Sequence, residues 1–146
     1  KLLLANSAGF GLLAEAGDML GRNRGGKAFL TLDDGCQLLP PVAVAAAHDQ
    51  VACLAQDGRL LVFPLDELKR QSNGGKGLTL MDVDAKTPLV SAATFADRLV
   101  VAGTGRGAKS RQEELKGAAL AQHAGRRARK GRKLEGFVKA LRVFAA

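Results

Sequence analysis

Short apolar runs separated by glycine-containing turns fill most of the chain. The stretches LLLANSAGFGLLA (2–14) and ACLAQDGRLLVFP (52–64) each read as strand, turn and strand. Runs of about four to seven residues between Gly, Asp and Asn are typical of β-strands. Pro64 and the Pro40-Pro41 pair suit strand ends or edges, because proline lacks the N–H that a central strand uses. The pattern predicts an all-β domain.

These strand-and-turn units repeat along the chain. The first and second units align after one gap, which brings Gly25-Gly26-Lys27 over Gly74-Gly75-Lys76. Each unit then contains two strands joined by a turn, a polar connection, a Gly-Gly-Lys turn and a third strand. A later apolar run, at 37–45 or 88–96, supplies a fourth strand. A four-stranded unit that recurs about every 47–49 residues is typical of a propeller-like array of blades.

A third unit is visible in a degraded form. Strand, turn and strand are predicted over 98–110, and a short inserted helix over 112–123. The segment GRRARKGRKLEGFVKALRVF (125–144) replaces the Gly-Gly-Lys turn with a longer, basic connection. We therefore predict a single domain over 1–146 with about three blades, which do not close a ring. Because the chain also begins at Lys1, we expect it to be part of a longer protein. The predicted repeats are roughly 1–48, 49–96 and 97–146.

The positive charge of the chain is concentrated in its last quarter. Residues 1–108 carry 11 Lys and Arg against 11 Asp and Glu, whereas residues 109–146 carry 11 against 3. Such asymmetry favours a polyanionic partner. A membrane surface would need bulky apolar anchors beside the cations, and the basic run has none, so nucleic acid is the favoured partner. No apolar stretch approaches the roughly 20 residues that span a bilayer.

The densest group of cations lies within residues 126–133 and has two interpretations. It is either a solvated tail or a loop between ordered elements that contacts a DNA backbone. The apolar residues Phe137, Val138 and Leu141 follow it and indicate a folded end, which favours the loop. Duplex DNA is favoured over single strands, because the chain has no Trp or Tyr on which bases could stack. The cations are Arg126, Arg127, Arg129, Lys130, Arg132 and Lys133.

The two Gly-Gly-Lys turns also have two interpretations. Glycines adopt positive φ in tight turns, and lysine protects an exposed strand edge. Alternatively, the turns offer backbone N–H groups and a nearby cation to a phosphate. Repetition does not separate the two, because a repeated fold repeats its turns. Neighbouring cations support the phosphate contact: Arg22, Arg24 and Lys27 at the first turn, and Lys69, Arg70 and Lys76 at the second.

The sequence predicts neither a metal site nor a cofactor site. Cys36 and Cys53 form no CxxC pair and are expected to be reduced, buried, small hydrophobes. His48 and His123 have no metal-ligand partners near them in the sequence. The GTGRG stretch (103–107) lacks the strand and helix of a nucleotide-binding loop, so a glycine turn is predicted there.

The repeat unit resembles the C-terminal repeats of the A subunits of bacterial type IIA topoisomerases. The resemblance is carried by AQDGRLLVFPLDELKRQSNGGKG (55–77) and GRRARKGRKLEGFVKALRV (125–143), and it covers essentially the whole chain. It implies a β-pinwheel, a propeller relative whose blades exchange a strand. The gyrase box QRRGGKG is degenerate here, since residues 71–77 keep five of its seven positions and residues 22–28 keep four. This degeneracy favours the topoisomerase IV branch of the family.

The resemblance implies a DNA-binding and DNA-bending domain that helps to engage and steer the transported duplex. Its implied setting is decatenation and supercoil relaxation during chromosome segregation in the bacterial cytoplasm. The implied partners are double-stranded DNA, the rest of the A subunit and the ATPase subunit ParE. Cleavage in this family needs a tyrosine nucleophile, and this chain has no Tyr, so the fragment is expected to be non-catalytic and without a cofactor. Two alternatives stay open: a gyrase wrapping domain and a propeller-like protein-interaction scaffold.

Overall fold

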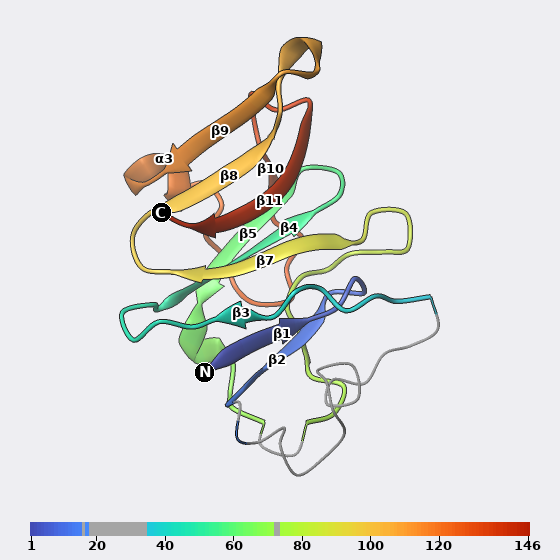
Figure 1. Cartoon of the computed structure of the whole chain (residues 1–146), viewed down its shortest axis with the longest axis vertical. Coiled ribbons are helices and arrows are strands. Elements are labelled where there is room, and N and C mark those ends of the chain that lie inside the picture. Colours follow the sequence, from blue (N-terminus) through green and yellow to red (C-terminus); the bar gives the residue numbers. More distant parts are fainter. Residues whose placement is uncertain (16, 18–34, 72–73) are drawn as a thin grey trace.

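The computed structural model describes every residue of the chain except 16, 18–34 and 72–73. Three small antiparallel sheets follow one another along the long axis of the molecule, in the order of the three repeats (Figure 1). None of the helices in the described residues is long and apolar enough to cross a membrane.

Each sheet is built around a hairpin of two neighbouring strands. The first sheet has the order β3 (Val42–Ala43), β1 (Leu2–Ala5), β2 (Phe10–Ala14), β6 (Leu78–Thr79). The second has the order β10 (Arg132–Lys133), β5 (Arg59–Pro64), β4 (Gln50–Ala55), β7 (Leu89–Phe95). The third has the order β11 (Lys139–Ala145), β8 (Leu99–Thr104), β9 (Ser110–Leu115). The helical turns are η1 (Leu65–Glu67), η2 (Arg106–Ala108) and α3 (Gly117–Ala121).

The outer strand of a sheet comes from the following repeat. Strand β6 belongs to the second repeat, yet it pairs with β2 of the first, with Leu78 opposite Gly11. Strand β10 belongs to the third repeat and pairs with β5 of the second, with Arg132 opposite Leu60. This exchange ties consecutive blades together. The predicted β-pinwheel is confirmed; in the described residues two of its sheets have four strands and the third has three.

The central sheet buries both of its faces, which explains why its strands show no polar alternation. In β4, Val51 and Cys53 join the core shared with the first sheet, whereas Ala52 and Leu54 join the core shared with the third. All four side chains are fully buried. A strand covered on both faces reads as a continuous apolar run, as observed in VACLA.

Two predicted elements are shorter than expected. Residues 112–123 were expected to be helical, but β9 extends to Leu115 and α3 covers only Gly117–Ala121. The backbone ladder to β8, with Leu115 opposite Leu99, and the burial of Leu115 outweigh the helical composition of this segment. The expected strand at 37–45 is reduced to β3, which pairs with β1 over two residues. The predicted third strand of the first repeat, after Lys27, lies outside the described residues.

Candidate nucleic-acid interface

The cations of the C-terminal run lie on a loop whose two ends are fixed to β5. We call residues 125–133 the basic segment. At its start, the Gly125 N–H donates to the Val62 carbonyl at 2.8 Å, and the Val62 N–H donates to the His123 carbonyl at 2.9 Å. At its end, the segment becomes β10 and pairs with Arg59 and Leu60 of β5.

The middle of the basic segment crosses to the first sheet. The Ala128 N–H donates to the Leu80 carbonyl at 2.9 Å, and the Asp82 N–H donates to the Arg129 carbonyl at 2.9 Å. Leu80 and Asp82 closely follow β6, the outer strand of the first sheet. The loop is therefore ordered and lies across the seam between two blades, in agreement with the interpretation as a loop rather than a tail.

Arg127 has a different role from its neighbours. Its backbone N–H donates to Glu67 Oε1 at 2.9 Å, and its Nη1 donates to the Thr79 carbonyl at 2.8 Å. The side chain is half-buried, and these bonds join the second blade, at η1, to the outer strand of the first. Arg127 thus holds the loop in place, although the sequence singled it out only as a cation.

Arg59 is a second fixing residue, and it was not identified from the sequence. Its Nε lies 2.9 Å from Asp57 Oδ2, and its Nη1 donates to the carbonyls of Asp82 and Lys130 at 3.2 and 3.0 Å. Its Nη2 donates to Thr87 Oγ1 at 3.4 Å, and only 18% of the side chain is exposed. In the sequence, Arg59 directly follows the Asp-Gly turn between β4 and β5. An arginine in that position looks like an ordinary hairpin residue, so the sequence alone offered no reason to select it.

The remaining cations of the basic segment face solvent on this fixed backbone. Within the described residues, none of them takes part in an ion pair. Because the backbone is already fixed, a polyanion that contacts them orders only side chains, which lowers the entropic cost of binding. The exposed cations are Arg126, Arg129, Lys130, Arg132 and Lys133.

The basic segment occupies the same place in its blade as residues 71–77 do in theirs. Gln71 donates its N–H to the Leu13 carbonyl of the neighbouring blade at 2.8 Å, as Gly125 does to Val62. Residues 71–77 are followed immediately by the exchanged strand β6, and residues 125–131 by the exchanged strand β10. Residues 125–131 therefore match residues 71–77 without insertion, and the prediction of a longer third connection is wrong.

The backbone conformation supports this equivalence. Gly77 and Gly131 close the two segments with φ of 82° and 77°. Three residues earlier, Gly74 has φ 71° and Ala128 has φ 73°, so alanine takes the left-handed conformation that glycine takes in the other copy. The gyrase-like box is thus present in a third version, GRRARKG, with arginines where residues 72–73 are Ser and Asn.

The cations near the two Gly-Gly-Lys turns are less clearly grouped. Lys76 is exposed and its Nζ lies 4.8 Å from the centre of the Phe10 ring. Arg70 Nη2 lies 3.7 Å from Glu15 Oε2, and Lys69 is exposed. Arg22, Arg24 and Lys27 lie outside the described residues, so their arrangement stays a prediction.

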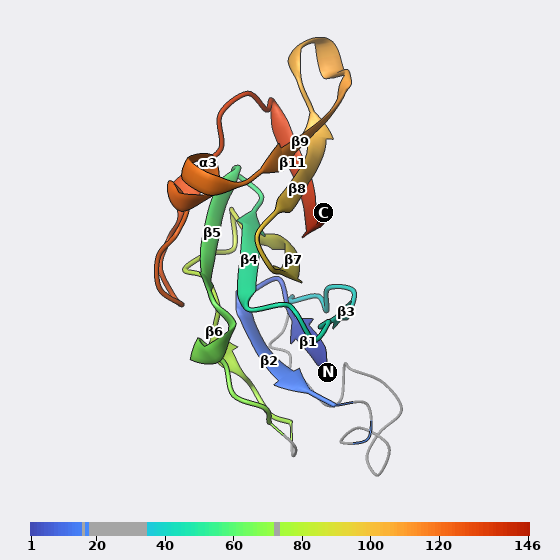
Figure 2. The same ribbon diagram turned by 90° about the vertical axis from the view of Figure 1, so that its left-hand side faces the viewer.

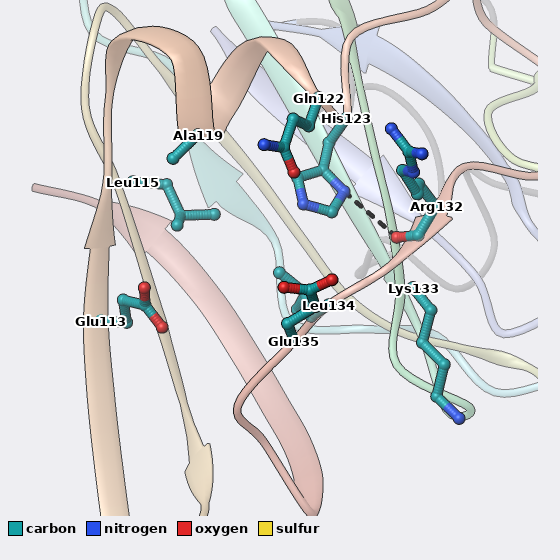
Figure 3. A pocket seen from close by; sticks show the side chains of 9 residues that line it. All are labelled: Glu113, Leu115, Ala119, Gln122, His123, Arg132, Lys133, Leu134 and Glu135. Carbon is teal, nitrogen blue, oxygen red and sulfur yellow. Dashed lines mark hydrogen bonds between the residues drawn. The ribbon is translucent and has the colours of Figure 1, made fainter.

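A hollow of about 400 Å³ lies beside the basic segment, between β9, α3 and β10 (Figure 3). His123 points into it from the end of α3 and donates its Nδ1–H to the Arg132 carbonyl at 3.1 Å. The residue is 6% exposed. Burial lowers the pKa of the His123 imidazole, and hydrogen bonds to the carbonyls of Leu60 and Arg132 offset part of this effect. His123 therefore acts as a neutral structural group that fixes the start of β10.

Buried neutral His123 makes the stability of the domain depend on pH. Its pKa is lower in the folded state than the value of about 6.5 in the unfolded chain, so the unfolded chain binds more protons between the two values. The free energy of unfolding should fall as the pH drops from 7 towards 5, by at most about 1.4 kcal/mol per pH unit. Urea unfolding at several pH values measures this. The His123→Gln variant keeps a donor for the Arg132 carbonyl and should lose the pH dependence that His123 causes. If the free energy of unfolding fell equally with pH in both proteins, a buried neutral His123 would be contradicted.

The two cysteines differ in burial. Cys53 is fully buried, and burial raises the pKa of its thiol to about 12, so the thiol is unreactive at neutral pH. This confirms the predicted buried hydrophobe at Cys53. Cys36 is only half-buried, so the same prediction is wrong there, because Cys36 lines an open hollow of the surface. In the part of the chain that the structure describes, no group of three or more His, Cys, Asp or Glu could hold a metal ion.

Comparison with known proteins identifies A subunits of DNA topoisomerase 4 as relatives of the chain. No protein-family model matches the chain. The chain is 37% identical over 99 residues to the A subunit of DNA topoisomerase 4 from Escherichia coli K12, covering 68% of this chain and 12% of that protein. It is 33% identical over 133 residues to the A subunit of DNA topoisomerase 4 from Neisseria gonorrhoeae, covering 87% of this chain and 17% of that protein. The chain therefore spans less than a fifth of the length of these curated relatives.

The fold comparison agrees with the sequence comparison. The C-terminal domain of E. coli ParC matches with a TM-score of 0.81 at 30% identity, over 98% of this chain and 59% of that chain. The C-terminal domain of DNA gyrase A matches with a TM-score of 0.74 at 15% identity, over 99% of this chain and 48% of that chain. At this lower identity, the second match shows a shared fold only.

Proposed function

Because the chain belongs to the family of C-terminal domains found in topoisomerase IV A subunits, we propose that it binds duplex DNA and bends it for the enzyme. In this role it engages the transported duplex and steers it towards the catalytic part during decatenation and supercoil relaxation. The rest of the A subunit and the ATPase subunit ParE are its proposed partners, in the bacterial cytoplasm on the chromosome. The domain itself is proposed to be non-catalytic and without a cofactor.

The observation that carries this proposal is the basic segment. Its exposed cations stand on a backbone that is hydrogen-bonded to both β5 and the residues after β6. A rigid strip of cations suits the regular phosphates of a duplex, and phosphate contacts fix position without reading sequence. We therefore propose recognition of DNA shape and charge, with little preference for sequence.

A gyrase-like wrapping activity is the second candidate, and one observation favours it. The third copy of the box, GRRARKG, carries two arginines at the positions where the gyrase box QRRGGKG has them. However, Arg127 is the second of these, and its guanidinium is already bonded to the Thr79 carbonyl. Simple bending is therefore preferred. Wrapping would change the writhe of relaxed closed-circular DNA that is incubated with the domain and a nicking-closing enzyme, whereas in-plane bending would not.

A salt titration tests DNA binding. Five phosphates neutralised by the five exposed cations contribute about −4.5 to the slope of a plot of log K against log salt concentration. The measurement is fluorescence anisotropy of a labelled duplex between about 0.05 and 0.4 M salt, with a second duplex of scrambled sequence that should bind equally well. A protein-interaction scaffold would show no binding even at the lowest salt concentration, and this result would reject the proposal.

A further inference from the structure

The hairpin formed by β8 and β9 extends beyond the rest of the molecule. Both views place it at one extreme end of the long axis (Figures 1 and 2). Its turn, residues 105–109, is closed by the Gly105 N–H donating to the Lys109 carbonyl at 2.8 Å and the Ala108 N–H donating to the Gly105 carbonyl at 3.1 Å. Gly107 and Ala108 both have positive φ, 72° and 59°. The tip is therefore a hydrogen-bonded turn with a defined backbone conformation, and its residues 106–109 are exposed.

The tip of this hairpin is cationic, unlike the tips of the other two. Arg106 and Lys109 are exposed, and neither takes part in an ion pair within the described residues. The nearest acidic residue along β9, Glu113, is already paired with Arg111. The first hairpin turn, residues 6–9, has no charge, and at the second the charge of Asp57 is balanced by Arg59.

Two lysines, Lys133 and Lys139, extend the row of exposed cations from the basic segment towards this tip. Lys133, the last residue of the basic segment, runs past Gly58 at the tip of the second hairpin. Lys133 and Lys139 line one hollow of about 170 Å³. Lys139 in turn pairs with Thr104, at the base of the β8–β9 turn. Exposed cations therefore continue from the second blade to the end of the third.

We propose that the tip of the β8–β9 hairpin is a second phosphate contact for the duplex held by the basic segment, made by Arg106 and Lys109. This inference rests on the proposed DNA binding. Stacked sheets lie about 10 Å apart, which corresponds to about three base pairs of duplex, so one duplex reaches both blades. Two contacts on one rigid body determine the direction of the duplex, whereas a single loop only attracts it. The hairpin thus sets the path of the DNA across the third blade.

The test compares three double variants of the full 146-residue chain. In Arg106→Gln with Lys109→Gln, two phosphate contacts are lost, so the salt slope on the labelled duplex should fall in magnitude by about 2. The control is Arg98→Gln with Lys116→Gln, which removes the same formal charge at the opposite end of β8 and β9, where Arg98 is paired with Glu114 at 3.3 Å. The control should keep the wild-type slope. The exchange variant Arg106→Lys with Lys109→Arg should also keep it, because it preserves both charges.

The possible results separate this inference from the proposal on which it rests. If the wild type binds and the tip variant keeps the slope of the control, the hairpin contact is wrong while DNA binding stands. If the wild type does not bind duplex DNA at low salt, both are wrong. A smaller slope in both the tip variant and the Arg98→Gln, Lys116→Gln control would indicate a general charge effect and would also overturn the hairpin contact. Thermal unfolding of each variant confirms that the fold is retained, since none of these four residues is buried.

Discussion

Replacing Arg126, Arg129 and Lys130 together by glutamine is expected to lower the affinity for duplex DNA by about two to three orders of magnitude at 0.1 M salt. Each lost phosphate contact removes about 0.9 from the salt slope, which at 0.1 M salt corresponds to roughly an eightfold loss of affinity per contact. The slope itself should fall in magnitude by about 3. These three side chains are exposed and their backbone is fixed elsewhere, so the variant should unfold at the wild-type temperature.

The control for this variant is the triple replacement of Lys86, Arg98 and Lys116 by glutamine. It removes the same charge from exposed positions outside the basic segment. If binding depended only on the net charge of +8, the two triple variants would lose affinity equally. Equal losses would therefore contradict a localised interface. Arg127 is left unchanged in both, because its bonds to Glu67 and Thr79 hold the loop, and its loss would mix destabilisation with lost binding.

The repeat architecture was predictable because its evidence is local. Short apolar runs, turn glycines and a period near 48 residues are properties of neighbouring residues, and they led to the blades and their order. The partner of the third strand in each unit was accessible only through the family resemblance. The sequence around Leu78 and Thr79 is equally compatible with pairing inside its own repeat or with β2 of the preceding one. A choice between sheets depends on non-local geometry, which a local pattern does not contain.

The candidate site was also predictable only in part. The exposed cations of the basic segment could be identified by counting charges. The residues that fix it could not, since Arg59 and Arg127 look like any other arginines until their backbone partners are known. The true length of the segment was hidden for a related reason. Ala128 takes the left-handed conformation of Gly74 in the other copy, so the glycine that would have revealed the alignment is missing.

A large effect on stability is expected at Gly131, where the basic segment turns into β10. Replacement by alanine should lower the free energy of unfolding by about 2–4 kcal/mol, which is a loss of roughly 10 °C in melting temperature for a domain of this size. The residue has φ 77°, which costs alanine about 1–2 kcal/mol. In addition, a Cβ there would lie 2.7 Å from the carbonyl oxygen of Leu60 and 3.1 Å from the Cβ of Leu61, so β5 and β10 would have to separate.

Two other substitutions separate the backbone strain from the steric clash at Gly131. Gly107 has a similar φ, 72°, but a Cβ there meets no atom within 4 Å, so Gly107→Ala should cost only the backbone contribution of about 1–2 kcal/mol. Ala128→Gly relieves a strained φ in the same loop and should raise stability by less than about 1 kcal/mol. Urea unfolding of the three variants gives the comparison. If Gly131→Ala cost no more than Gly107→Ala, the close contact between the basic segment and β5 would not exist, and the fixed backbone on which the interface depends would be lost with it.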